Sequence, residues 1–155
     1  MLQNLLSERI SIRDLTTIVE AIAEAAPGTH DIVQITEHVR SRLSRQICAQ
    51  HKSADGQLPI VTLSANWEQA FSEAMIGEGA NRQLALAPSK LHEFIADVRR
   101  AMEKAAMIGE SPVLLTSPGI RPFVRSLIER FRPQTTVMSQ GEVHAKVRLK
   151  AVGQI

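Results

Sequence analysis

The stretch most suggestive of chemistry is Ser117-Pro118-Gly119, which separates the apolar run PVLLTS from a basic, periodic segment. A serine and a glycine at a strand-to-helix junction could hold an anion on free backbone N–H groups, with Arg121 nearby, or expose a nucleophilic hydroxyl. A phosphate loop, however, ends in Gly-Lys-Ser/Thr, and a nucleophile elbow needs Gly-x-Ser-x-Gly. Pro118 also removes one N–H group. The sequence therefore favours a structural turn, and an anion site or enzyme using Ser117, Gly119 and Arg121 is the alternative.

Other residue types that support catalysis or metal binding are not grouped. The five histidines include no His-x-x-x-His or His-Glu-x-x-His pair, so the sequence predicts no metal site. Cys48 is the only cysteine, which rules out a disulfide within the chain and fits a reducing compartment. The pairs Glu20/Glu24 and Glu93/Asp97 stand one helical turn apart, a spacing typical of surface charge. We expect neither an enzyme nor a bound cofactor.

Composition narrows the classes of protein further. With 155 residues, of which 44% are hydrophobic and 22% charged, the chain can bury one ordinary core or two small ones. Aromatic residues make up only 3%, so stacking platforms are scarce and no nucleic-acid partner is expected. No apolar run approaches the ~18 residues of a membrane-spanning helix.

Positive charge is concentrated in the C-terminal third of the sequence. From Pro112 onward there are seven cations and two carboxylates, 7 − 2 = +5, whereas the whole chain carries +2. This part is either a solvated basic face or a contact for an acidic partner or a neighbouring subunit.

The first third has the apolar spacing of helices. A leucine-rich helix comes first, and Ser11, with Asp14 three residues later, predicts the start of a second helix that ends near Pro27. A third helix is expected over about 30–50. Its buried stripe would comprise Ile32, Ile35, Val39, Leu43 and Ile47. Its other faces would leave Arg40, Arg42 and Arg45 available outward.

After a polar break at about 51–57, strands alternate with helices. Strands are expected in LPIVTLS, PVLLTS, TTVMS and AKVRLKAV, with a hairpin ending the chain and with Leu149 and Ala151 on one face of its last strand. Helices are expected in ANWEQAFSEAM, over 88–107, and in the basic segment that ends at Phe131.

These patterns predict an α+β fold. A helical subdomain over 1–52 would be joined by the linker at 51–57 to a small α/β subdomain over 58–155. This second part would contain about four strands flanked by helices, because strands that alternate with helices bury their faces against them.

Several segments of the sequence, spread over nearly the whole chain, also carry a resemblance, because they look like segments that recur in one group of proteins. These segments are LQNLLSERISIRDLTTIVEAIAEAA, EHVRSRLSRQI, LPIVTLSANWEQAF, LLTSPGIRPFVRSLIERF and TTVMSQGEVHAKVRLKAVGQI. The chain resembles the FHIPEP family of flagellar and virulence type III secretion export-gate proteins, at the C-terminal end of their cytoplasmic region. Flagellar members are the most similar, although Ser64 and Gly141 stand where the family often has Asp and Asn.

The resemblance implies a non-enzymatic scaffold on the cytoplasmic side of the bacterial inner membrane. Its expected partners are other copies in a homo-nonameric ring, flagellar export chaperone–substrate complexes and components of the ATPase complex. Membrane contact would come only through a region preceding Met1, so the chain is expected to be a fragment. Because the helical subdomain is the family's main ring contact and arginine suits protein interfaces, we predict a subunit contact in that subdomain. The predicted residues are Arg13, Asp14, Arg40, Arg42 and Arg45.

Overall fold

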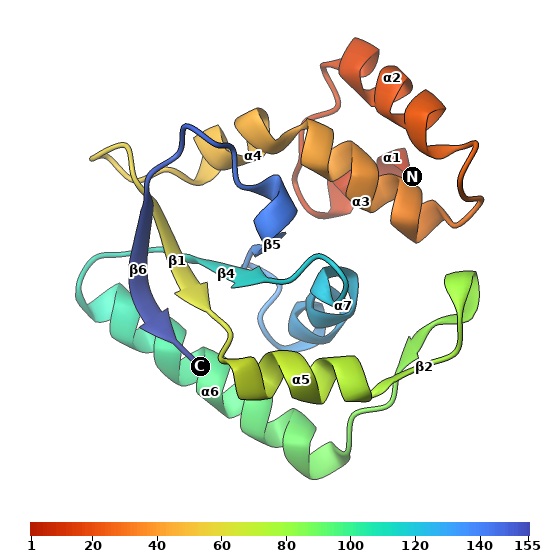
Figure 1. The fold of residues 1–155 in the computed structure, drawn as a ribbon. Coiled ribbons are helices and arrows are strands. Elements are labelled where there is room, and N and C mark those ends of the chain that lie inside the picture. The colour runs from red at the N-terminus through yellow and green to blue at the C-terminus, as the bar shows by residue number, and fades with distance from the viewer.

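The computed structural model describes residues 1–155 and places a group of N-terminal helices on one face of a small parallel sheet (Figure 1). The helices are α1 Leu2–Ser7, α2 Leu15–Ala25, α3 Ile32–Arg42, α4 Ser44–His51, α5 Ala65–Glu73, α6 Pro88–Met107 and α7 Arg121–Phe131. The strands of the sheet are β1 Leu58–Thr62, β4 Val113–Thr116, β5 Val137–Ser139 and β6 Leu149–Gln154. A short antiparallel pair, β2 Met75–Ile76 and β3 Gln83–Leu84, was not predicted from the sequence, and Met75 was expected at the end of the helix that forms α5.

Side chains cap the starts of α2, α3 and α5, and two helix predictions need correction. The carboxylate of Asp14 accepts from the backbone N–H of Thr17, so Asp14 caps α2. The predicted cap at Ser11 is wrong, because the Ser11 hydroxyl accepts from Arg13 N–H in the turn before the helix. The single helix predicted over 30–50 is also wrong, since the chain bends at Leu43 and continues as α4.

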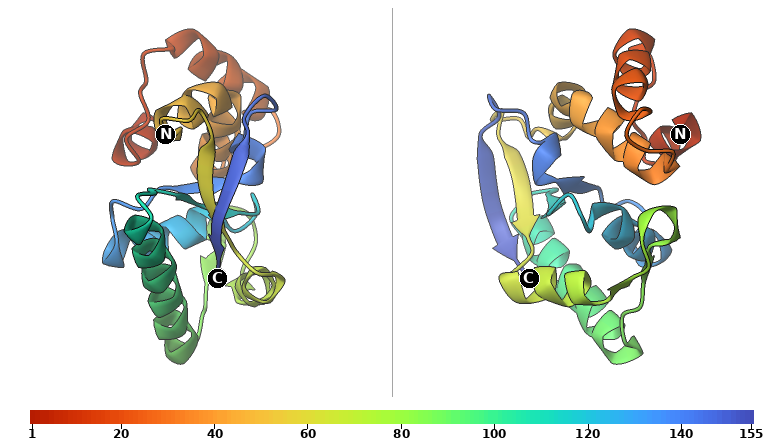
Figure 2. Two further views of the ribbon diagram at one scale, coloured as in Figure 1. Left: turned by 90° about the vertical axis from the view of Figure 1, so that its left-hand side faces the viewer. Right: turned by 45° about the vertical axis from the view of Figure 1, so that its right-hand side comes forward.

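The sheet has the order β5-β4-β1-β6, and every neighbouring pair is parallel. The predicted terminal hairpin is wrong: β6 pairs with β1, with Leu58 opposite Leu149, and not with β5. Leu149 and Ala151 were expected on one face of the last strand, and that face is not buried, since Leu149 is 44% exposed and Ala151 is exposed too. The reason is that β6 is an edge strand, which the N-terminal helices leave uncovered (Figure 2). The α+β fold class is confirmed.

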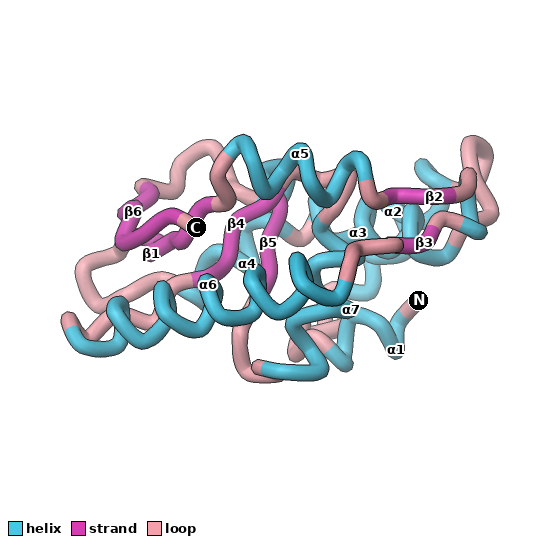
Figure 3. Tube along the Cα trace, turned by 90° about the horizontal axis from the view of Figure 1, so that it is seen from below, coloured by secondary structure: helices cyan, strands magenta, loops and turns pink.

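The buried apolar residues form two clusters, one on each face of the sheet. Figure 3 shows how the helices are arranged around the strands. On the α5–α7 side, Phe71 and Phe94 lie edge to face with ring centroids 4.8 Å apart, and Trp67 lies 5.1 Å from Phe94. On the other side, Leu5 and Ile18 belong to the same cluster as Ile60. The N-terminal helices and the sheet therefore share one core. The division at 51–57 stays a prediction about folding units.

The shared core generates a prediction for the exposed turn around Gly56. A specific protease site inserted there is expected to be cut readily, because the turn is exposed. The two pieces, 1–56 and 57–155, should nevertheless co-elute in gel filtration, because their side chains interdigitate on the α4 face of the sheet. The uncleaved insertion protein is the control. Separate elution of the pieces without denaturant would contradict a shared core.

Candidate functional site

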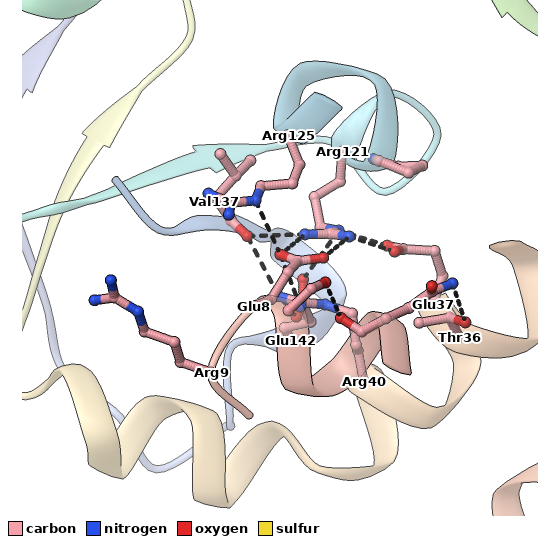
Figure 4. A network of polar contacts seen from close by, with 12 residues as sticks. Glu8, Arg9, Thr36, Glu37, Arg40, Arg121, Arg125, Val137 and Glu142 are labelled. Carbon is pink, nitrogen blue, oxygen red and sulfur yellow. Dashed lines mark hydrogen bonds and ion pairs between the residues drawn. The ribbon is translucent and has the colours of Figure 1, made fainter. Parts of the chain in front are cut away.

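Six charged side chains meet where α1, α3 and α7 approach β5 (Figure 4). They are Glu8, Glu37, Arg40, Arg121, Arg125 and Glu142. Three carboxylates balance three guanidinium groups, so the cluster carries no net charge. Arg40, Arg121 and Glu142 are almost completely buried, with exposed fractions of 1%, 2% and 1%. We call these six residues the buried charge cluster.

Arg121, the first residue of α7, joins three parts of the chain. Its Nη1 and Nη2 donate to both carboxylate oxygens of Glu8, at 2.8 and 3.0 Å. Its Nε and Nη2 donate to Glu37 at 2.7 and 2.6 Å. Nη1 also donates to the carbonyl oxygen of Val137 on β5, at 3.1 Å. A planar guanidinium suits two-pronged contacts of this kind, and a lysine in its place could not make them all.

Arg40 makes the second set of bonds in the cluster. Its Nη2 lies 2.6 Å from Glu142 Oε1 and donates to the Val137 carbonyl at 3.3 Å, while its Nη1 lies 3.1 Å from Glu8. The expectation that Arg40 points outward is therefore wrong. Arginine is rarely buried unless it is paired, and the partners that bury it, Val137 and Glu142, are about 100 residues away in the sequence.

The two carboxylates bound to Arg121 have pKa values shifted in opposite directions. Burial raises the pKa of Glu8, but hydrogen bonds from Arg121 and the charges of Arg121, Arg40 and Arg125 outweigh burial, so the net shift is downward. Burial also raises the pKa of Glu37, and there the net shift is upward despite the Arg121 hydrogen bonds, because the charge of Glu142 adds to the burial effect. The difference follows the number of cations close to each carboxylate.

The residues of the alternative anion site are not gathered around one point. The backbone N–H and the hydroxyl of Ser117 donate to the Glu68 carboxylate on α5, at 2.9 and 2.6 Å. Arg121 directs its guanidinium into the buried charge cluster, and Gly119 is exposed. The donors of this turn are thus held by a carboxylate of the chain itself.

The predicted interface residues likewise have separate roles. Arg42 is paired with Glu24, which also lies 2.9 Å from His38 Nε2 and whose pKa is lowered by its hydrogen bonds to His38 and Arg42. Asp14 caps α2. Arg13 and Arg45 are exposed. Nowhere do three or more His, Cys, Asp or Glu side chains converge as metal ligands would, and none of the helices has the length and apolarity to span a membrane.

An exposed apolar surface on the N-terminal helices was not predicted from the sequence. Val19 is 61% exposed and Leu15 is 54% exposed. Val19 directly follows the buried Ile18, and adjacent helical residues point about 100° apart. The sequence pattern alone did not show which of the two side chains faces the core. Six of the eleven large apolar residues that are exposed lie in this part, and we call them the helical apolar surface: Leu2, Leu6, Leu15, Val19, Ile32 and Val33.

Residues 1–148 match the model of the FHIPEP family. The chain belongs to the FHIPEP family. The flagellar biosynthesis protein FlhA of Caulobacter vibrioides is 60% identical over 155 residues, which are 100% of this chain and 22% of that protein. FlhA of Bacillus subtilis is 32% identical over 100% of this chain and 23% of its own length. The chain thus spans less than a quarter of these FHIPEP relatives.

Solved FHIPEP-type structures share the fold. The CdsV protein of Chlamydia pneumoniae has a TM-score of 0.90 at 31% identity, over 99% of this chain and 44% of that one. The nonameric EPEC SctV-C has a TM-score of 0.88 at 28% identity, over 99% and 46%. A complex of CdsV and CdsO from Chlamydia pneumoniae matches with a TM-score of 0.83 at 30% identity, over 99% and 45%. The resemblance seen in the sequence is confirmed.

A pair of matched substitutions measures how much the buried charge cluster contributes to the stability of the protein. Arg40→Met is expected to destabilise the protein by about 3–5 kcal/mol, because the buried Glu142 carboxylate loses the cation at 2.6 Å and keeps only Arg121, 3.9 Å away. Arg42→Met, two residues further along the same helix, removes only an exposed pair with Glu24 and should leave the urea midpoint near that of the unchanged protein. Equal midpoints for the two variants would contradict the structural role of Arg40.

The opposite pKa shifts of Glu8 and Glu37 predict opposite pH effects. The lowered pKa of Glu8 contributes stability that is present above its unfolded-state pKa and is lost as pH falls through the folded-state pKa. The raised pKa of Glu37 contributes stability that is fully present below the unfolded-state pKa. This stability is lost as pH rises through the folded-state pKa. We compare the free energy of unfolding at pH 7 with that at about pH 3.5, which lies below the ordinary Glu pKa of about 4.3. Between these pH values Glu8→Gln should lose less stability than the unchanged protein. Glu37→Gln should lose more.

Urea unfolding at the two pH values measures both effects, and the other carboxylates cancel because all three proteins share them. The same slope of stability against pH for Glu8→Gln and Glu37→Gln would show that the two carboxylates do not differ in the folded state.

Proposed function

We propose that this chain is the assembly part of a type III protein export gate, in which the N-terminal helices contact neighbouring copies in a ring. The observation that carries the proposal is the helical apolar surface. Single exposed apolar residues are ordinary on a protein surface, whereas here six large ones fall within the first 33 residues, which favours a binding role for these helices. The proposal is supported by the nonameric state of the related SctV-C.

In this proposal the exposed charges around the apolar surface form the rim of the contact. Protein interfaces typically have an apolar centre and a polar rim, with arginine enriched. Arg13 and Arg45 suit such a rim, because neither has an ion-pair partner within the chain, and Asp14 and Arg42 are also exposed. Arg40 is removed from the predicted contact because it is buried.

The wider role follows the family. The chain would lie on the cytoplasmic side of the bacterial inner membrane and act as a scaffold without a catalytic step. Its proposed partners, besides other copies, are export chaperone–substrate complexes and components of the ATPase complex. The related CdsV has been solved in a complex with CdsO, which supports a partner besides other copies.

The test places a charge in the apolar surface of the intact protein. Leu15→Asp and Val19→Asp are expected to abolish or strongly reduce ring formation, measured by electron microscopy and light scattering, and to reduce flagellar protein export. Both positions are more than half exposed, so circular dichroism should show unchanged folding. Met107→Asp is the matched control, because Met107 is 87% exposed but lies at the C-terminal end of α6.

Charge reversal at the rim should have a smaller effect than either apolar substitution. Arg45→Glu is expected to weaken rings mainly at low salt, since exposed charge pairs are screened. Rings that form normally with both Leu15→Asp and Val19→Asp would overturn the proposal.

A further inference from the structure

The two edge strands of the sheet, β5 and β6, differ in how far other parts of the molecule cover them. At the β5 edge, the carbonyl oxygen of Val137 accepts hydrogen bonds from Arg40 and Arg121 at 3.3 and 3.1 Å, so side chains of the buried charge cluster cover it. At the other edge, β6 is the last strand of the sheet and lies at the outer margin of the molecule in the right-hand view of Figure 2. One edge is closed and the other is open.

The open edge presents backbone groups without a strand partner. Arg148 accepts from Leu58 N–H, so its carbonyl points toward β1. Alternate residues of a strand direct their N–H and C=O groups to opposite sides. Leu149 and Ala151 therefore direct theirs away from β1, where the sheet has no further strand.

Few of the usual devices protect this edge. Proteins blunt exposed edges with short strands, prolines, outward lysines or bulges. The pairing of β6 with β1 has one register shift, between Ile60 and Val61, and it comes after Leu149 and Ala151. At six residues β6 is the longest strand of the sheet, and it contains no proline. Lys150, its only cation, is tied to Glu110 and lies 3.9 Å from Asp55. The edge is thus available for pairing.

A cleft of about 480 Å³ lies beside the C-terminal half of β6. It is bounded by α6, through Asp97, Arg100, Ala101 and Lys104, and by residues 152–155. Such a cleft could take side chains from a strand added at the edge.

The charge around this edge is mainly positive and favours an acidic partner. Arg100 and Lys104 outnumber Asp97, and at the start of β6 Lys146 and Arg148 are exposed and have no ion-pair partner in the chain. A second copy of the chain would bring these same cations together, whereas an acidic segment would neutralise them.

We propose that the free edge of β6 is a docking site for an extended acidic segment of a partner protein, which adds to the sheet as a fifth strand. Main-chain hydrogen bonds would provide affinity in this mode, and side chains entering the α6–β6 cleft would provide selectivity. The site is separate from the helical apolar surface, so it does not depend on the proposed ring contact.

The probe is a synthetic peptide, Glu-Val-Thr-Val-Glu-Val-Thr, added to the ¹⁵N-labelled 155-residue chain, with the same peptide carrying Lys for Glu as comparison. NMR titration is expected to show shifts at the amides of Leu149 and Ala151, with hydrogen-exchange protection there, for the acidic peptide only. Binding should weaken at least tenfold in 0.5 M salt.

Two kinds of variant separate backbone pairing from general charge attraction. Ala151→Pro removes an N–H group on the open side of β6 and should abolish binding, while the unchanged amides of β1 report that the sheet is intact. Arg148→Glu should weaken binding at least fivefold, whereas Arg130→Glu, the same charge change on the exposed surface of α7, should not.

Three results would overturn the proposal. The first is no binding of the acidic peptide at the β6 amides, or binding that survives Ala151→Pro. The second is equal binding of the lysine peptide. The third is concentration-dependent dimerisation of the chain that Ala151→Pro removes, which would make a second copy the occupant of the edge.

Discussion

The burial of the Arg121 guanidinium constrains the rest of this structure. A charged group at 2% exposure is tolerated only where carboxylates and carbonyl oxygens surround it. Those acceptors come from α1, α3 and β5, so Arg121 is satisfied only when the N-terminal helices sit on the sheet in one orientation. Apolar contacts alone are non-directional. The charge cluster supplies the directional part of the contact between the two halves of the chain.

Arg40 and Glu142 extend this constraint to the connection that leaves β5. Glu142 accepts from Ser139 N–H at 2.7 Å and thereby fixes the turn after the strand, while its other oxygen holds Arg40 on α3. From that turn the chain crosses to the far side of β1 and forms β6. The same carboxylate therefore helps to close one edge of the sheet and to start the connection that leads to the open edge.

A fixed orientation between the halves suits a scaffold. The helical apolar surface belongs to α1, α2 and the start of α3. The open edge of β6 lies away from these helices, at the end of the sheet opposite β5 (Figures 1 and 2). If copies assemble through the first surface, the orientation set by the charge cluster decides where each β6 edge points. The backbone N–H and the hydroxyl of Ser117 donate to Glu68 and so tie α5 to the turn before α7.

The sequence by itself determined the elements whose signals are local, and it determined the family. Strands β1, β4 and β5 and helices α5, α6 and α7 could be read from apolar periodicity, because strand and helix place successive side chains at different angles. The family followed from motifs spread over the whole chain. Only the tertiary structure decided that Arg40 is buried and paired, that β6 pairs with β1 and that Val19 is exposed. A helical arginine beside an apolar stripe is solvated unless distant acceptors enclose it, and alternation along a strand does not specify its neighbour. Both outcomes depend on groups far away in the sequence, which meet only when the chain has folded.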